Sequence, residues 1–200
     1  VSHLGRPDSR RVASLSLGPI AKHLQKLLKR KVLKLNDIVG PNVEKMISNS
    51  DADVVVLENV RFDPREEKND KAFAKQLARL GDIFVSEAFG TSHRAHASTV
   101  GVAKFLPSYA GFLVEKEFNA LQPLLKKPKR PFLMIVGGAK IDTKIGILQQ
   151  FLKKADSIFI GGAMANTFLA AEGFDVGGSL YEKDKLDVAR EIILKTHDKK

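Results

Sequence analysis

The sequence contains no cysteine, which excludes disulfides, thiolate nucleophiles and cysteine-ligated metal sites. It also lacks any apolar stretch approaching the ~18 residues that a membrane span needs. The first residues, Val1-Ser2-His3-Leu4-Gly5-Arg6-Pro7, lack the apolar segment of a signal peptide. We therefore expect a cytoplasmic protein with no membrane partner. The chain does not begin with Met and stops in a basic run, so we expect both ends to be cut from a longer protein.

Tryptophan is absent and only two tyrosines occur, although the formal net charge is +10. A positive charge of this size favours anionic partners such as nucleic acid, anionic lipid or phosphorylated metabolites. A nucleic-acid-binding module would need basic residues interleaved with exposed aromatic side chains. Most phenylalanines lie instead in apolar strand or helix patterns. We therefore expect no nucleic-acid partner and favour small phosphorylated molecules.

Short apolar runs alternate with helical patterns along the chain. β-Branched and aromatic runs typical of buried parallel strands lie at residues 32–35, 54–57, 83–85, 132–136 and 158–160. Helical patterns lie at residues 20–28, 71–80, 144–154 and 163–171. This alternation predicts βαβ units around mostly parallel sheets. The predicted fold class is α/β, with two Rossmann-like lobes.

A long helix and a basic linker divide the chain. Residues 112–127 form a helical pattern, and Lys127-Pro128-Lys129-Arg130-Pro131 follows. Proline lacks a backbone N–H and clashes with the preceding helical turn, so the helix cannot continue through this linker. We infer a first lobe at residues 1–110, an inter-lobe helix and linker at residues 111–129, and a second lobe at residues 130–200.

The second lobe contains one strand-to-helix turn twice. Gly137-Gly138-Ala139 and Gly161-Gly162-Ala163 each follow an apolar strand, and we expect a helix to start after each. Glycines there expose backbone N–H groups, and a helix start adds partial positive charge. Lys140 and Lys144 are predicted to share a helix face at i and i+4, where they would bind an anion or stand as two solvated lysines. The sequence has neither a P-loop nor a G-x-G-x-x-G fingerprint.

Arginines of the first lobe lie in a glycine loop or after predicted strands. Arg6 lies in the loop at residues 2–7, whereas Arg61 and Arg94 each follow a strand. If both strands belong to one parallel sheet, their carboxyl ends share an edge, so Arg61 and Arg94 should converge and the Arg6 loop could join them. Guanidinium groups bind phosphate and carboxylate in bidentate fashion. Taken singly, each arginine is better explained as a surface residue, whereas the pattern of the three favours an anion-binding site.

Histidines lie beside these arginines. His3 precedes Arg6 in its loop, and His93 and His96 flank Arg94. No carboxylate–histidine pattern of metal-ligand spacing surrounds them, so we expect no metal site here. We expect hydrogen bonds to an anionic substrate instead.

Six motifs follow one another along the chain. They are Ser-His-Leu-Gly-Arg-Pro at 2–7, Glu-Asn-Val-Arg-Phe at 58–62, Ala-Phe-Gly-Thr-Ser-His-Arg-Ala-His at 88–96, Gly-Phe-Leu-Val-Glu-Lys-Glu at 111–117, Gly-Gly-Ala-Lys-Ile-Asp-Thr-Lys at 137–144 and Gly-Gly-Ala-Met-Ala-Asn-Thr-Phe at 161–168. In this order they resemble the phosphoglycerate kinase family over the whole chain. Small departures are Ser86-Glu87 in place of Asn-Asp and Ser9 in place of a common glycine. The family also has an earlier strand and loop with a further substrate arginine, and later segments that bind adenine and magnesium, so both lobes should be incomplete here.

The resemblance implies a glycolytic kinase, a transferase that moves a phosphoryl group reversibly between 1,3-bisphosphoglycerate and ADP to give 3-phosphoglycerate and ATP. It implies a monomer that uses Mg²⁺ bound with the nucleotide, with the protein ligand of the metal outside this chain. Lys140 would reach the transferring group and Lys144 the nucleotide phosphates. The alternative is a catalytically inactive fragment with partial ligand binding. The implied substrate-binding residues are His3, Leu4, Gly5, Arg6, Arg61, His93 and Arg94, and the nucleotide-binding residues are Gly137, Gly138, Ala139, Lys140, Lys144, Gly161 and Gly162.

Overall fold

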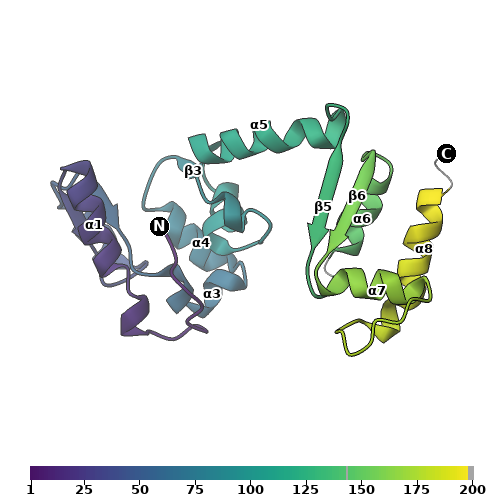
Figure 1. The fold of residues 1–200 in the computed structure, drawn as a ribbon. Helices are drawn as coiled ribbons and strands as arrows, with labels where there is room; N and C mark the ends of the chain where they lie inside the picture. Colours follow the sequence, from purple (N-terminus) through teal and green to yellow (C-terminus); the bar gives the residue numbers. More distant parts are fainter. Residues whose placement is uncertain (143, 198–200) are drawn as a thin grey trace. The chain divides into compact units, whose positions relative to one another are not determined.

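The computed structural model describes residues 1–142 and 144–197 (Figure 1). The chain divides into two compact units, Val1–Phe118 and Asn119–Lys200. The division falls within one helix, α5 (Phe112–Lys126), which matches the helix predicted there. The predicted boundaries at residues 110 and 130, which set this helix apart from both lobes, stay a prediction.

The first unit contains two pairs of parallel strands. β1 (Val32–Lys34) pairs with β2 (Val54–Val56), and β3 (Phe84–Ser86) pairs with β4 (Ser108–Ala110). Among the described residues, no hydrogen-bonded ladder joins the two pairs. β2 and β3 therefore do not form one continuous sheet, and the premise from which the convergence of the two strand-end arginines was predicted is wrong.

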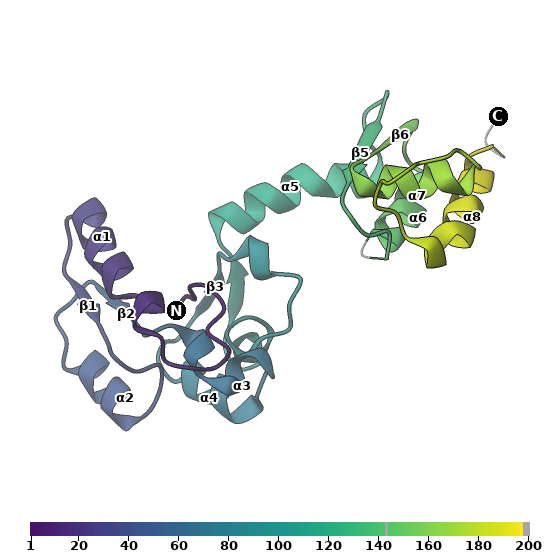
Figure 2. The same cartoon turned by 60° about the horizontal axis from the view of Figure 1, so that its bottom comes forward.

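The N-terminal segment explains the separation, because it lies between the two strand pairs (Figure 2). The backbone N–H of Val60, just beyond β2, donates a hydrogen bond to the carbonyl oxygen of Ser2 at 3.2 Å. Val1 and His3 line the same cavity as Phe84 of β3. The end of β2 thus bonds to the N-terminal segment rather than to β3.

A helix of the first unit begins at a residue whose side chain caps its first turn. Asp70 precedes α4, and its carboxylate accepts a hydrogen bond from the N–H of Phe73 at 2.7 Å, which satisfies a free donor of the first turn. Phe73 and Val43 are buried in the core cluster beneath these helices. The helices are α1 (Gly18–Leu28), α2 (Pro41–Ser48), α3 (Pro64–Glu67) and α4 (Lys71–Ala78).

The second unit is built on the parallel pair of β5 (Leu133–Gly137) and β6 (Ser157–Gly161). Helices α6 (Ile145–Leu152), α7 (Ala163–Ala171) and α8 (Leu186–His197) lie on one side of this pair (Figure 1). Their apolar side chains form a separate core cluster that includes Val136, Ile141, Leu148 and Met164. Side chains alternate between the two faces of a strand, and Leu133, Ile135 and Phe159 point away from this cluster and are exposed. No helix within the described part of the chain has the length and apolar character that a membrane crossing requires.

Candidate functional site

The glycine loop at residues 2–7 is fastened to the end of β2. Asn59 is fully buried, and its Nδ2 donates a hydrogen bond to the carbonyl oxygen of Leu4 at 2.8 Å. Arg61 donates from Nη1 to the carbonyl oxygen of Gly5 at 2.9 Å. The arginine of this loop is exposed to solvent. Two side chains of the Glu-Asn-Val-Arg-Phe motif therefore fix the backbone on the N-terminal side of Arg6.

Arg61 itself is buried, with 7% of its surface exposed. Its Nε lies 3.4 Å from a carboxylate oxygen of Glu67, but the geometry makes no hydrogen bond, so Nε stays a buried donor without an acceptor. Buried donors are nearly always paired in folded proteins. Arg61 thus supports the glycine loop through Nη1, while its buried Nε–H has no hydrogen-bond acceptor.

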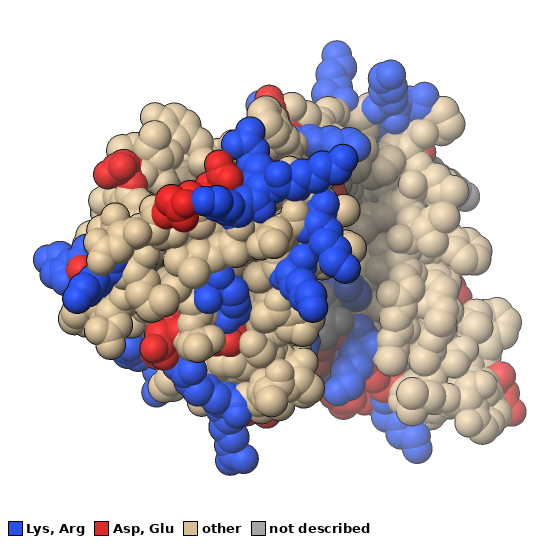
Figure 3. Space-filling model, turned by 90° about the vertical axis from the view of Figure 1, so that its left-hand side faces the viewer, with Lys and Arg blue, Asp and Glu red and all other residues tan. Residues whose placement is uncertain are grey.

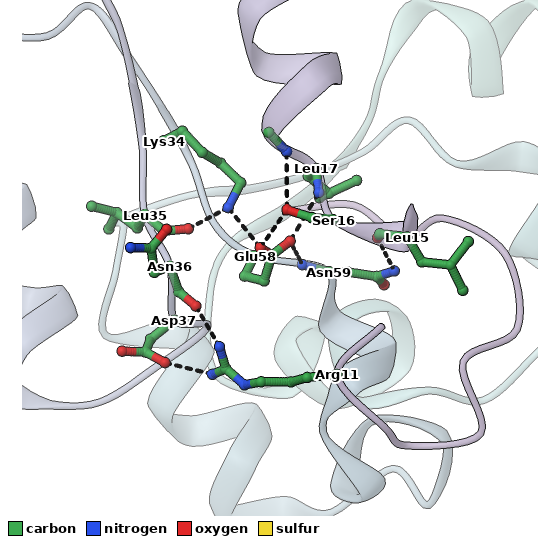
Figure 4. A network of polar contacts seen from close by, with 11 residues as sticks. Arg11, Leu15, Ser16, Leu17, Lys34, Leu35, Asn36, Asp37, Glu58 and Asn59 are labelled. Carbon is green, nitrogen blue, oxygen red and sulfur yellow. Dashed lines mark hydrogen bonds and ion pairs between the residues drawn. The ribbon is translucent and has the colours of Figure 1, made fainter. Parts of the chain in front are cut away.

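A buried carboxylate lies behind the loop (Figure 4). Glu58 accepts hydrogen bonds from the N–H groups of Leu17 and Asn59, at 2.9 and 2.8 Å, and from Ser16 Oγ at 2.8 Å. Lys34 Nζ approaches the same carboxylate at 3.0 Å. Burial pushes the pKa of Glu58 upward, but these donors outweigh burial and hold its pKa at about 2, against an ordinary value of 4.5. Glu58 is therefore ionised at neutral pH and joins the start of α1 to the end of β2.

Positive charge converges on His3, which is partly exposed. The pKa of His3 is lowered, first by burial and then by the charges of Arg61, His96 and Arg94; Glu67 opposes them. The charges of Arg61 and Arg94 therefore both act on the same imidazole, although their strands belong to different pairs. A bound anion would reduce the electrostatic repulsion among these cations.

Polar contacts also hold the loop that carries Arg94. Arg94 Nε donates to Nε2 of the exposed His93 at 3.3 Å, and Thr99 Oγ1 donates to the carbonyl oxygen of Arg94 at 3.2 Å. The next contact is with α3, where the buried Glu66 accepts hydrogen bonds from the N–H and Oγ of Ser98, at 2.9 and 2.5 Å. Glu66 thus ties the Arg94 loop to the helix that follows Arg61.

The sequence patterns did not single out Glu66 or Asn59. Both are polar residues that the structure buries, at 2% and 0% exposure. The signal available for Asn59 was its place inside the motif that carries Arg61. Glu66 stands in a charged run, Arg65-Glu66-Glu67-Lys68, and nothing in that run distinguishes the buried carboxylate from the exposed ones.

In the second unit the two glycine turns lie side by side. Gly137 and Gly161 are opposite each other in the β5–β6 register. The N–H of Met164 in α7 donates to the carbonyl oxygen of Gly138 at 2.9 Å. Gly162 has φ +70°, and a Cβ there would lie 3.0 Å from the carbonyl oxygen of Gly138. Only glycine suits both the conformation and the close approach.

The predicted helical pairing of the two lysines is wrong. Ala139 and Lys140 lie in the exposed loop after β5, and α6 begins one residue after Lys144, which is its N-cap residue. The reason is Ile141, whose side chain is fully buried and whose N–H donates to a Glu182 carboxylate oxygen at 2.5 Å. The chain therefore turns at this residue before the helix starts, and Lys140 lies outside the helix.

One part of the basic surface is separate from these loops. Lys and Arg side chains project over the α1 side of the first unit (Figure 3). Beside α1 an open hollow of about 790 Å³ is lined by Lys26, Arg30 and Lys31 at the amino ends of β1 and β2. Arg30 is paired there with Asp53 at 3.3 Å. This hollow lies at the opposite edge of the strand pair from Asn59 and its neighbours, so net charge alone does not locate the candidate site.

The fold is therefore an α/β protein of two units, with cationic loops on the first and paired glycine turns on the second. The sequence profile described as phosphoglycerate kinase matches residues 1–200, and the chain belongs to this family. It is 54% and 51% identical, each over 194 residues, to the phosphoglycerate kinases of Pelotomaculum thermopropionicum and Moorella thermoacetica, covering 96% of this chain and 49% of each relative. The structure of phosphoglycerate kinase from Coxiella burnetii is similar, with a TM-score of 0.83 at 39% identity over 99% of this chain and 50% of that one. The chain spans about half the length of the curated relatives it matches.

Proposed function

We propose that this chain supplies part of each of the two ligand sites of a phosphoglycerate kinase, which transfers a phosphoryl group between 1,3-bisphosphoglycerate and ADP. The observation that carries the proposal is a cavity of about 370 Å³ that His3 lines together with Val60, which is next to Arg61, and Thr91, on the loop of Arg94. The exposed Arg6 and His93 belong to the same loops as these residues. With the backbone of Leu4 and Gly5, these side chains would hold the glycerate substrate.

Phosphoryl transfer depends mainly on positioning and on neutralising the charge of the phosphates. Lys144 lies at the N-terminus of α6, where backbone N–H groups and the helix dipole favour an anion, and would bind the nucleotide phosphates. Lys140 would reach the transferring group. The glycines of the two turns, Gly137 with Gly138 and Gly161 with Gly162, would let the nucleotide approach the backbone.

Mg²⁺ would accompany the nucleotide and neutralise part of its phosphate charge. Hard cations of this kind prefer carboxylate and other oxygen ligands. In the part of the chain that the structure describes, no group of three or more His, Asp or Glu side chains could hold a metal ion. As the family resemblance implies, we expect the protein ligand of Mg²⁺ to lie outside this chain.

Kinetic measurements on a full-length phosphoglycerate kinase containing this sequence test the proposal. Replacing Arg94 with Ala should raise the KM for 3-phosphoglycerate about ten-fold or more, as expected for loss of one charged hydrogen bond, and spare the KM for ATP. Lys144→Ala should do the reverse. Lys26→Ala, in the hollow beside α1, is the cationic control and should change neither. An inactive parent, or equal effects of Arg94→Ala and Lys26→Ala, would contradict the proposal.

Titration of His3 by NMR gives an independent measurement. In the free protein the pKa of His3 is lowered by burial and by neighbouring cations. Bound 3-phosphoglycerate should raise it, because the phosphate and carboxylate favour the charged imidazole. The affinity for 3-phosphoglycerate should therefore increase as the pH falls through the pKa of His3 in the complex.

A coupled assay on the 200-residue chain alone then distinguishes an active enzyme from the alternative, an inactive fragment that keeps partial ligand binding.

A further inference from the structure

A carboxylate from a distant part of the sequence holds the first glycine turn. Glu182 accepts the N–H of Ile141 at 2.5 Å, and Ile141 directly follows Lys140. Because the Ile141 side chain is fully buried, its backbone is anchored from both directions, by apolar packing and by this hydrogen bond. Hydrogen bonds from backbone N–H groups to carboxylates are about twice as strong as neutral ones.

The backbone of Glu182 is itself bonded to α7, the helix that follows the second glycine turn. Its N–H donates to Oγ1 of Thr167 at 3.1 Å, and Thr167 is a fully buried residue of α7. Asn166, one position earlier on the helix, donates from Nδ2 to the carbonyl oxygen of Leu180 at 3.1 Å. The segment before α8 is therefore attached to the helix that starts at the second turn.

An ion pair also connects the segment after Glu182 to the loop that follows β5. Lys185 Nζ lies 3.0 Å from a carboxylate oxygen of Asp142, the residue after Ile141. The contact with Asp142 and a weaker one with Asp184 raise the pKa of Lys185. Both side chains of the link are partly exposed, so the ion pair is worth little by itself. The Glu182 hydrogen bond is partly buried and reaches the backbone of the fully buried Ile141.

We propose that Glu182 is a positioning residue for the nucleotide side of the site, an inference that rests on the proposed function. Glu182 touches neither substrate nor nucleotide in this scheme. It fixes the backbone at Ile141. This sets the backbone position from which the side chain of Lys140 extends, and it restrains the chain that leads to the N-cap residue Lys144. Removing the carboxylate leaves the Ile141 N–H without its partner and lets the loop between β5 and α6 move relative to α7.

Kinetics of Glu182 variants in the full-length kinase test the inference. Glu182→Ala should raise the KM for ATP about ten-fold, the effect of one such hydrogen bond, and lower kcat. The KM for 3-phosphoglycerate should not change, because that site lies in the other unit. Glu182→Gln keeps an acceptor oxygen and should restore most of the nucleotide affinity. Glu191→Gln, at an exposed carboxylate of α8 paired with Lys195, is the matched control and should behave as wild type.

A merely structural role predicts a different pattern. It would reduce the folded fraction and the melting temperature without moving the KM for ATP, and that result overturns the inference. If Glu182→Ala and Glu182→Gln both fail to fold, the role is likewise structural and the inference is wrong.

Amide hydrogen exchange at Ile141 separates this inference from the proposed function. The amide should be protected in the wild type and in Glu182→Gln, and exchange faster in Glu182→Ala, whether or not the protein is an active kinase. Equal exchange in the wild type and Glu182→Ala would show that the hydrogen bond does not hold the turn. An inactive wild type with the expected exchange pattern would instead count against the kinase assignment alone.

Discussion

At the scale of single residues, buried polar side chains hold the loops of the first unit where they are. Asn59 and Glu58 are 0% and 6% exposed. Asn59 donates to the carbonyl oxygens of Leu4 and Leu15, and Glu58 accepts the N–H of Leu17. A buried polar group without partners destabilises a fold, whereas a fully paired one fixes a single arrangement of the backbone. The glycine loop that carries Arg6 therefore owes its position to hydrogen bonds that apolar packing could not replace.

The depressed pKa of Glu58 predicts a pH dependence of stability. A lowered folded-state pKa stabilises the fold above the unfolded value of 4.5, and this contribution is lost as the pH falls through 4.5 towards 2. The shift corresponds to about 3 kcal/mol of unfolding free energy. Urea unfolding of wild type and Glu58→Gln at several pH values measures it. The free-energy difference between the two proteins should shrink as the pH falls from 5 to about 2, and a constant difference would contradict the explanation.

At the scale of elements, periodicity and residue type predicted the strands and most helices near their observed places. Ala163–Ala171 has the predicted bounds, and the run at residues 83–85 is displaced by one residue in β3. β4, Ser108–Ala110, was not predicted, because a three-residue exposed strand has no apolar run. Short α2 and the terminal α8 were also missed. Their patterns are mixed with polar residues, and tertiary packing decides their form.

The candidate site residues could be predicted because each lies in a short sequence motif. The burial and the hydrogen-bond partners of their side chains could not be predicted from the sequence. Arg61 was predicted as an anion contact, and its burial and its hydrogen bond to the carbonyl oxygen of Gly5 were not predicted. The prediction that Lys140 and Lys144 share a helix face was wrong for a related reason. Spacing suggested a helix, and a contact with the distant Glu182 sets the turn instead. Long-range hydrogen bonds of this kind leave no periodic signal in the sequence.

Gly162 is a position at the scale of elements where one added methyl group should destabilise the fold. Gly162→Ala forces a side chain into φ +70° and brings its Cβ to 3.0 Å from the carbonyl oxygen of Gly138. We expect a loss of about 1–3 kcal/mol in unfolding free energy and weaker ATP binding by the full-length kinase. Calorimetry and nucleotide titration measure the two effects.

Gly146→Ala is the control for this substitution. Gly146 lies within α6, and a Cβ there would meet nothing within 4 Å. Gly146 lies in the first turn of α6, where alanine has a higher helix propensity than glycine, so the substitution should stabilise the protein by at most about 0.5–1 kcal/mol. Similar effects of the two substitutions would show that the contact between the glycine turns does not constrain the backbone.

At the scale of the whole molecule, the two units have separate hydrophobic cores. Phe73 belongs to the cluster of the first unit and Leu148 to that of the second, and both are fully buried. The described residues of the two clusters do not overlap, so each unit has its own source of stability. Domains with their own cores can fold as separate units, and the division inside α5 makes this a testable property of the chain.

Core substitutions should therefore act on one unit at a time. Phe73→Ala should destabilise the first unit by about 3–5 kcal/mol and Leu148→Ala the second by about 2–5 kcal/mol, through lost burial and the cavity left behind. Hydrogen exchange resolved by peptide measures each unit separately. Phe73→Ala should speed exchange in β2 and α4 and leave β5 and α7 unchanged, and Leu148→Ala should do the opposite. Faster exchange throughout both units in either variant would show that they unfold as one cooperative body.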